Sequence, residues 1–250
     1  MKRHLIAALL GLAASMPALA VDFVANDTTQ SNVAPPPGSE SSLQTILNNL
    51  FPGSGINVNT DQSSAAFWSS STPSAASTIP TMVAEFTANA AAQSFGIWFG
   101  TDTDHIVSYN LLLGGASAND AVGVTINGNT LEVFGPNSSC GIKFNCGTFT
   151  NALINPTSFG FFFKPQPNGP TYYSLDQLNG PGRSDRFIAF QDGGTTNWLF
   201  AYEDGSDWDY NDMAVKVESI TAVPEPQTYA LMMAGLAAVG FMSRRRKHLV

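Results

Sequence analysis

Residues 122–134 read VGVTINGNTLEVF, and this stretch sets the expected fold class. Apolar residues alternate with polar or small ones on both sides of Asn127-Gly128, which is the pattern of two half-buried strands. An Asn-Gly pair suits a two-residue type I′ turn, because both central positions of that turn need positive φ. The stretch therefore predicts an antiparallel β-hairpin.

The same period of two recurs along most of the chain. Short strands separated by turns rich in Gly, Asn and Pro are expected throughout this part. They are expected at residues 82–87, 95–99, 106–113, 122–126, 129–134, 159–163, 186–190, 198–202 and 213–220. No crossover helix separates them, which disfavours a parallel sheet. The predicted fold class is therefore all-β, an antiparallel β-sandwich or jelly roll over residues 43–222.

One short amphipathic helix is expected at residues 43–50, before the first strand. Its apolar residues have the i, i+3, i+4, i+7 spacing of a single helix face: Leu43, Ile46, Leu47 and Leu50. Ser41 or Ser42 can cap its N-terminus, and Pro52-Gly53 ends the pattern.

Two polar segments flank this helix. Residues 21–42 contain a run of three prolines and a glycine, residues 35–38, and are interpreted as a solvated linker. Residues 61–80 are rich in Ser and Thr and are expected to form a loop. Phe67 and Trp68 lie in that loop, and we expect it to place an aromatic anchor on the core.

Composition and charge narrow the function classes. The 250 residues are 44% hydrophobic and 12% charged, which is too apolar for a disordered chain. Residues 21–222 hold 18 acidic and five basic residues, a net charge of −13. Nucleic acid is therefore excluded as a partner, because phosphate binding needs clustered Lys and Arg.

The N-terminal residues 1–20 have the features of a secretory signal peptide. Lys2 and Arg3 give a positive start, residues 5–12 are apolar, and Ala18-Leu19-Ala20 supplies the small residues that signal peptidase requires. Cleavage after Ala20 and export of the remainder are predicted.

The C-terminal residues 223–250 form a second targeting segment. Residues 229–242 are 14 uncharged residues, fewer than the about 17–25 that a spanning helix needs. The arginines Arg244, Arg245 and Arg246, with the lysine that follows them, favour a cytoplasmic location for that end. The run is thus expected to engage the inner membrane only as a short helix.

This tail resembles the PEP-CTERM sorting signal of Gram-negative, exopolysaccharide-producing bacteria. Pro224, Glu225 and Pro226, the apolar helix and the arginine cluster occur in the order of that signal. The resemblance implies transient inner-membrane anchoring, recognition by an exosortase and removal of the tail. It also implies delivery to the cell surface or extracellular matrix, with membrane contact only through the tail before processing.

Cys140 and Cys146 are separated by five residues in a predicted loop. Because an exported protein meets an oxidising compartment, a disulfide between them is predicted. A zinc site would need further thiol or imidazole ligands, and His105 is the one histidine outside the two targeting segments. Beside Asp102 and Asp104, His105 is interpreted as a loop residue rather than a catalytic base.

Residues 203–212, here called the acidic turn, carry five carboxylates and one amide between two apolar strands. Close carboxylates repel one another unless they point into water or surround a cation. Calcium takes six to eight oxygen ligands of these kinds. We predict a calcium site, with a solvated turn or catalytic carboxylates as alternatives; the expected ligands are Glu203, Asp204, Asp207, Asp209, Asn211 and Asp212. Gly205 is expected to let the backbone turn.

An EF-hand is rejected, although Asp207, Asp209, Asn211 and Glu218 have the spacing of its positions 1, 3, 5 and 12. The glycine that this loop requires at position 6 is Asp212 here. Glu218 is instead expected within the last strand.

The last 60 residues before the tail resemble the DUF4114 domain of bacterial secreted proteins and large adhesins. The resemblance is carried by Phe159-Gly160-Phe161-Phe162, Tyr173-Ser174, Asn179, Asp185-Arg186-Phe187, Glu203-Asp204, Asp207 and Asp209-Tyr210-Asn211-Asp212. It implies a secreted, calcium-binding β-sandwich without an assigned activity. This chain departs from the family in its short Gly205-Ser206 turn and in Arg186, where His is common.

Three function classes follow. The first is a calcium-stabilised surface or matrix module that holds exopolysaccharide or another cell, as in a biofilm, with Trp208 or Tyr210 as sugar contacts if they do not pack inward. The second is a glycan hydrolase with a carboxylate pair such as Glu203 and Asp207, about 5–9.5 Å apart. The third is a structural coat protein in which calcium stiffens the fold. We favour the first.

Overall fold

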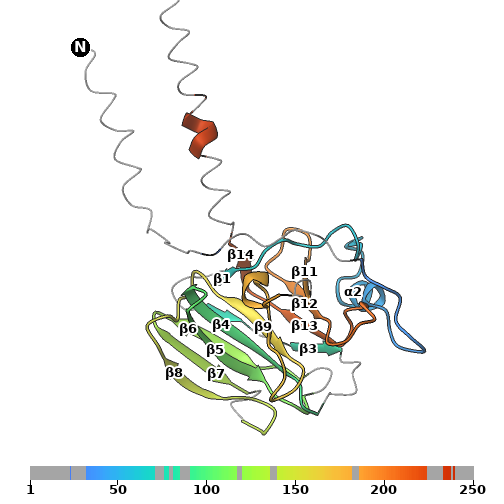
Figure 1. Ribbon diagram of the computed structural model, residues 1–250, viewed down its shortest axis with the longest axis horizontal. Coiled ribbons are helices and arrows are strands. Elements are labelled where there is room, and N and C mark those ends of the chain that lie inside the picture. The colour runs from blue at the N-terminus through green and yellow to red at the C-terminus, as the bar shows by residue number, and fades with distance from the viewer. Residues whose placement is uncertain are drawn as a thin grey trace, which may run out of the picture.

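The computed structural model describes residues 23, 32–70, 76–78, 81–84, 91–116, 120–135, 140–181, 186–223, 233–237 and 239. Strands dominate these residues, and every strand pairing among them is antiparallel. The predicted all-β fold class is confirmed (Figure 1). The signal peptide and the Pro-Glu-Pro and arginine elements of the tail lie outside the described residues.

The strands of the described residues form three four-stranded sheets and a two-stranded ribbon. Sheet I has the order β10 (Tyr172–Tyr173), β9 (Gly160–Lys164), β4 (Ser94–Asp102), β5 (His105–Leu112). Sheet II has the order β11 (Phe187–Gln191), β12 (Trp198–Tyr202), β13 (Met213–Val217), β3 (Thr81–Ala84). Sheet III has the order β2 (Ala76–Thr78), β6 (Gly123–Asn127), β7 (Thr130–Phe134), β8 (Gly147–Thr150), and the ribbon pairs β1 (Trp68–Ser70) with β14 (Ile220–Ala222).

Aromatic side chains fill the space between sheets I and II. The ring centroids of Phe161 and Phe200 lie 4.7 Å apart, and those of Phe163 and Tyr202 lie 5.1 Å apart. Trp68 is fully buried in the same cluster, with its ring 4.8 Å from that of Phe200. The segment 61–80 therefore delivers an aromatic anchor as expected, although it also contains β1 and β2 instead of forming a loop throughout.

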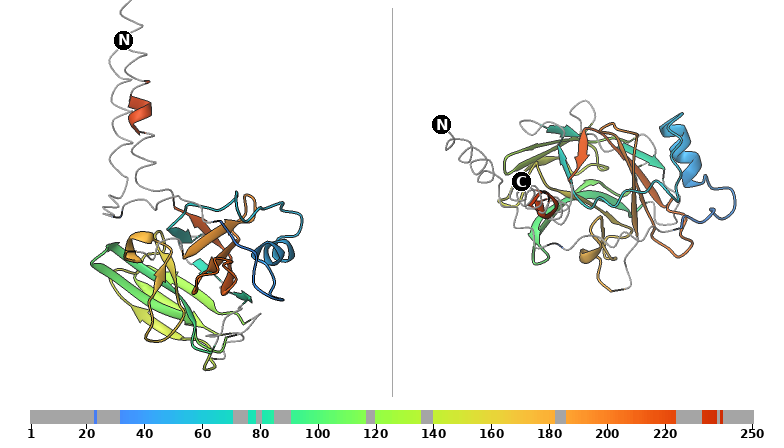
Figure 2. Two further views of the ribbon diagram at one scale, coloured as in Figure 1. Left: turned by 45° about the vertical axis from the view of Figure 1, so that its right-hand side comes forward. Right: turned by 90° about the horizontal axis from the view of Figure 1, so that it is seen from above.

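Helix α2 (Leu43–Leu50) covers the outer face of sheet II, as both views in Figure 2 show. It begins where predicted, because the Ser42 hydroxyl accepts a hydrogen bond from the backbone N–H of Thr45 at 3.3 Å. Leu43 and Leu47 pack in one cluster with Leu199 of β12. With both faces covered, every residue of β12 is buried, so the acidic turn that follows it starts from a rigid base.

The last predicted strand, residues 213–220, is divided in the structure. β13 ends at Val217, Ser219 has a left-handed φ of 64°, and the chain resumes as β14. The reversal at Ser219 moves the chain from sheet II to the ribbon with β1. Glu218 lies between the two strands and not within one, which corrects the expectation.

The predicted linker has no helix or strand between residues 32 and 42, but it is not solvated throughout. The backbone N–H of Val33 donates to Asn59 Oδ1 at 2.8 Å, and that of Ala34 donates to the carbonyl of Trp208 at 2.8 Å. Hydrogen bonds therefore attach this segment to the body of the fold.

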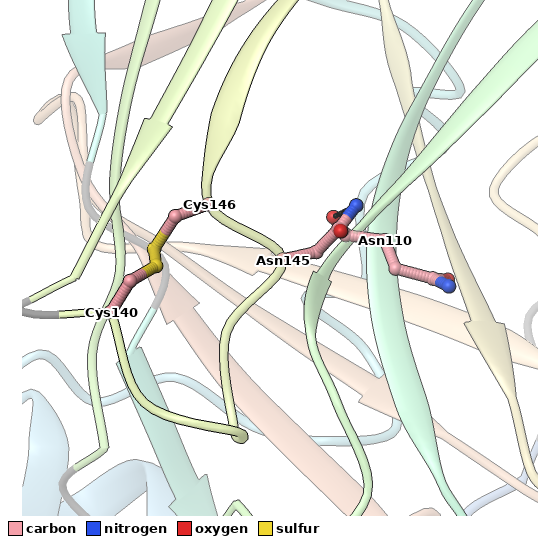
Figure 3. The surroundings of a disulfide bond; sticks show 4 residues. All are labelled: Asn110, Cys140, Asn145 and Cys146. Carbon is pink, nitrogen blue, oxygen red and sulfur yellow. Dashed lines mark hydrogen bonds between the residues drawn. A yellow bond between two sulfur atoms is a disulfide. The ribbon is translucent and has the colours of Figure 1, made fainter.

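Cys140 and Cys146 form the predicted disulfide, with their Cα atoms 6.0 Å apart (Figure 3). The loop that it closes lies along the edge strand β5, where Leu112 and Phe144 form a β-bridge. The side-chain amide of Asn145 donates to the carbonyl of Asn110 at 3.1 Å. Since β8 begins directly after Cys146, the closed loop connects an edge of sheet I to an edge of sheet III.

The described part of the tail, residues 233–237 and 239, is helical. Met233, Leu236 and Val239 are each more than half exposed, so this helix presents apolar side chains to its surroundings. Among the residues that the structure describes, no helix is both long and apolar enough to cross a membrane.

Candidate metal centre

The acidic turn joins the two central strands of sheet II. β12 and β13 are paired as far as Tyr202 and Met213, so the ten residues 203–212 connect two neighbouring strands. Trp208 and Tyr210 have left-handed φ values of 60° and 56°, which is uncommon for bulky side chains. Tyr210 is fully buried, whereas Trp208 is 36% exposed, so the two candidate sugar contacts have different roles.

Three of the predicted ligands converge. Carboxylate oxygens of Glu203, Asp207 and Asp209 all lie within 4.8 Å of one another. Glu203 and Asp209 are buried, and Asp207 is exposed. Two unit charges at this distance repel by about 1 kcal/mol in water and by about 3.5 kcal/mol at an effective dielectric of 20. The fold therefore concentrates negative charge at this point.

Gly205 makes room for this convergence. A Cβ atom at this position would lie 3.3 Å from both Asp207 Oδ1 and Glu203 Oε1. Gly205 is not among the glycines with positive φ, so its place in the turn rests on this close packing and not on a left-handed backbone conformation.

Backbone N–H groups satisfy part of the cluster. The two Glu203 oxygens accept from Gly205 N at 2.7 Å and Tyr210 N at 3.4 Å. Asp209 Oδ1 accepts from Asn211 N at 3.1 Å. Asp209 Oδ2 is buried and has no hydrogen-bond partner among the described residues. A buried carboxylate oxygen without a donor is costly unless a cation meets it.

Asp204 and Asp212 form a separate pair beside the cluster. Asp212 Oδ2 accepts from the backbone N–H of Asp204 at 2.6 Å, and Gln93 Nε2 donates to Asp204 Oδ2 at 3.2 Å. Burial, with the charges of Asp204 and Glu203 adding to it, raises the pKa of Asp212 to about 8. Asp204 and Asp212 are thus not among the three carboxylates whose oxygens converge.

Burial also raises the pKa values of Glu203 and Asp209. The charge of Asp207 raises both pKa values further, and the charge of Glu40 adds to the effect on Asp209. Without a cation, these two carboxyl groups therefore hold their protons more tightly than exposed carboxyl groups do.

Arg186 brings one positive charge to the turn. Its Nη1 donates to the carbonyl of Gly205 and lies 3.8 Å from Glu203 Oε1. Its guanidinium also lies 4.4 Å from the centre of the Trp208 ring, which holds that exposed side chain in place. One cation offsets only part of the charge of the three converging carboxylates.

The side chain of Asn211 connects the acidic turn to the N-terminal segment. Its Nδ2 donates to Glu40 Oε2 at 3.4 Å and to the carbonyl of Ser41 at 3.3 Å. Sequence reasoning missed Glu40 and Gln93 at this site. They are 171 and 111 residues from their partners in the turn, and no local spacing signals such contacts.

His105 lies apart from this site, as the exposed first residue of β5 directly after the turn from β4. Its Nδ1 is 2.7 Å from Asp102 Oδ1, which also accepts from the backbone N–H of Asp104. The hydrogen bond with His105 contributes most to lowering the pKa of Asp102. These contacts close the β4–β5 turn, and His105 is the first residue of a strand and not the loop residue that was expected.

Comparison with known proteins identifies one targeting element. Residues 222–247 match the PEP-CTERM protein-sorting motif, which spans 26 of the 250 residues. Neither a curated protein nor a solved structure matches the chain. The motif marks an exported protein that is processed by an exosortase and sorted toward the surface of a Gram-negative bacterium.

Proposed function

We propose that the folded body is a calcium-stabilised module of the cell surface or extracellular matrix. Asp209 Oδ2 carries this proposal, because it is a buried oxygen without a donor in a cluster of three carboxylates. A divalent cation would supply the missing partner and reverse the repulsion among Glu203, Asp207 and Asp209.

Calcium suits this donor set better than other common ions. The converging ligands are all carboxylate oxygens, which hard cations prefer, and zinc would favour imidazole or thiolate. Calcium tolerates irregular geometry, whereas magnesium demands near-octahedral coordination. In this proposal Glu203, Asp207 and Asp209 hold the ion, while Asp204, Asn211 and Asp212 shape the turn around them. The resemblance to DUF4114 domains supports the same assignment.

The export address supports a role with exopolysaccharide or another surface glycan. Trp208 is the side chain that we assign to sugar contact, since it is 36% exposed and held by Arg186 beside the acidic turn. Aromatic rings with one solvent-exposed edge are favoured at binding surfaces. Attachment of the body to matrix glycan would place the protein in a biofilm.

Cosedimentation with exopolysaccharide, in calcium and in excess chelator, tests the binding role. Trp208→Ala should abolish calcium-dependent sedimentation. Phe134→Ala is the matched control, because Phe134 is 37% exposed but lies on β7 in sheet III. Equal sedimentation of the two variants would show that Trp208 does not contact the sugar. A protein that binds calcium but cosediments with none of the glycans would favour the coat-protein alternative.

The hydrolase alternative draws no support from the carboxylate pair. Glu203 is fully buried and both of its oxygens accept backbone N–H groups, so it is positioned to hold the turn rather than to meet a sugar. Release of reducing ends from a polysaccharide, lost in Asp207→Asn, would reinstate that alternative.

A further inference from the structure

We propose that Glu40 belongs to the cation site and that the bound ion fastens residues 32–42 across the acidic turn. This inference rests on the proposed calcium site, and it adds a ligand from a distant part of the chain. It also assigns the ion a second role, as a clamp on the segment that precedes α2.

Glu40 is already directed at the site. Its Oε2 lies 3.4 Å from Nδ2 of Asn211, whose side chain is 1% exposed. Asn211 is joined to Asp209 through its own backbone N–H. Glu40 therefore approaches the side of the turn that carries Asp209, the residue with the unpartnered buried oxygen.

The segment around Glu40 is attached to the fold at both ends. On one side, Ala34 N donates to the carbonyl of Trp208 at 2.8 Å, inside the acidic turn. On the other side, Ser42 caps α2, whose Leu43 and Leu47 are fully buried against sheet II. Residues 32–50 thus form a strap that crosses the turn and ends in a docked helix.

The charge of the turn decides how firmly this strap is held. A fourth carboxylate beside Glu203, Asp207 and Asp209 adds repulsion, and among the described residues the Glu40 carboxylate receives only the hydrogen bond from the neutral amide of Asn211 in return. A divalent cation among these groups changes the sign, because Glu40 is then attracted to the site. Ion binding should therefore protect the strap more than the rest of the sandwich.

Hydrogen exchange of the full chain, with calcium or with excess EGTA, tests this directly. In the wild type, calcium should slow exchange in residues 32–50 by at least tenfold and leave residues 123–134 of sheet III almost unchanged. Glu40→Gln keeps an acceptor for Asn211 but loses the charge. The Glu40→Gln variant should lose this protection and weaken the calcium Kd at least tenfold, because one charge as far as about 5 Å from a divalent ion in water already has an effect of that size.

Glu132→Gln is the matched control, since it removes one exposed charge from β7. It should behave as the wild type in both measurements. If Glu40→Gln binds calcium as tightly as the wild type, or if calcium raises the melting temperature without protecting residues 32–50, the clamp is wrong and the calcium site stands. If the wild type binds no calcium, both proposals fail.

Discussion

Replacing Asp209 by Asn should have opposite effects in chelator and in calcium. Asn has the same shape and keeps an oxygen for the hydrogen bond from Asn211 N. It removes one charge from a buried cluster whose oxygens lie within 4.8 Å. In chelator, the variant should therefore be more stable than the wild type, although it replaces a proposed ligand of the ion with a neutral group.

The magnitude follows from the distances. Each carboxylate pair at 4.8 Å costs between about 1 and 3.5 kcal/mol, depending on the effective dielectric. Asp209 has two such neighbours, but Asp207 is exposed and the pKa of Glu203 is raised, so both repulsions are reduced. We expect a gain of about 1–3 kcal/mol in the free energy of unfolding at pH 8, or roughly 2–12 °C in melting temperature.

Urea denaturation in EGTA and in 10 mM calcium measures the stability change expected in each condition. The variant should gain stability in EGTA and lose most of the calcium increment, because a ligand charge is missing. Asp104→Asn, an exposed carboxylate in the β4–β5 turn, should stay within about 0.5 kcal/mol of the wild type in both conditions. A lower stability of Asp209→Asn in EGTA would show that the carboxylates do not repel one another as described, and the charge argument would then be refuted.

Three further predictions follow from other features. In chelator, the free energy of unfolding should fall as pH rises from about 4 toward 8. The reason is that the pKa of Asp212 is raised to about 8 in the folded state, so the folded state binds this proton more tightly than the unfolded state does. Urea titrations in which stability rises over this window would contradict the burial of these carboxyl groups. Cys140→Ser with Cys146→Ser should lower the free energy of unfolding by about 2–2.5 kcal/mol for so short a loop; an unchanged urea midpoint would show that contacts of the loop with β5 hold it without the bond. Glu225→Ala should leave the chain unprocessed in the membrane fraction of a host that contains an exosortase, as immunoblotting of fractions can establish; normal release would exclude the sorting motif as the processing signal.

Local patterns predicted the parts of the fold that local physics determines. The hairpin of residues 123–134 and the helix capped by Ser42 depend on strand alternation and on the i, i+3, i+4, i+7 spacing. The turn differs from the expected type I′ turn at Asn127-Gly128: Asn127 pairs with Thr130, so its two central residues are Gly128 and Asn129, and of these only Gly128 has a positive φ, 58°. The convergence of Glu203, Asp207 and Asp209 was also within reach, since all three lie in one short turn. These features needed no knowledge of distant partners.

The remaining features depend on contacts between distant residues. β10 has two residues and β14 has three, which are too few for an alternating apolar and polar pattern to be recognised in the sequence. Glu40 and Gln93 reach the site from other elements. Tyr210 is fully buried and Trp208 is partly exposed. Both have a left-handed φ, a backbone conformation that the side-chain type alone does not indicate.

Calcium titration of the purified protein by calorimetry and thermal melting is the most direct test of the metal site. We expect binding with a Kd of about 10⁻⁴ to 10⁻³ M, in the range of extracellular modules. At 10 mM calcium this corresponds to about 1.4–2.7 kcal/mol of stabilisation and a rise of about 3–11 °C in melting temperature relative to EGTA. The double variant Asp207→Ala, Asp209→Ala should show neither the heat nor the rise. A wild-type melting temperature that is the same in calcium and in EGTA, with no heat of binding, would contradict the proposal that calcium holds the acidic turn.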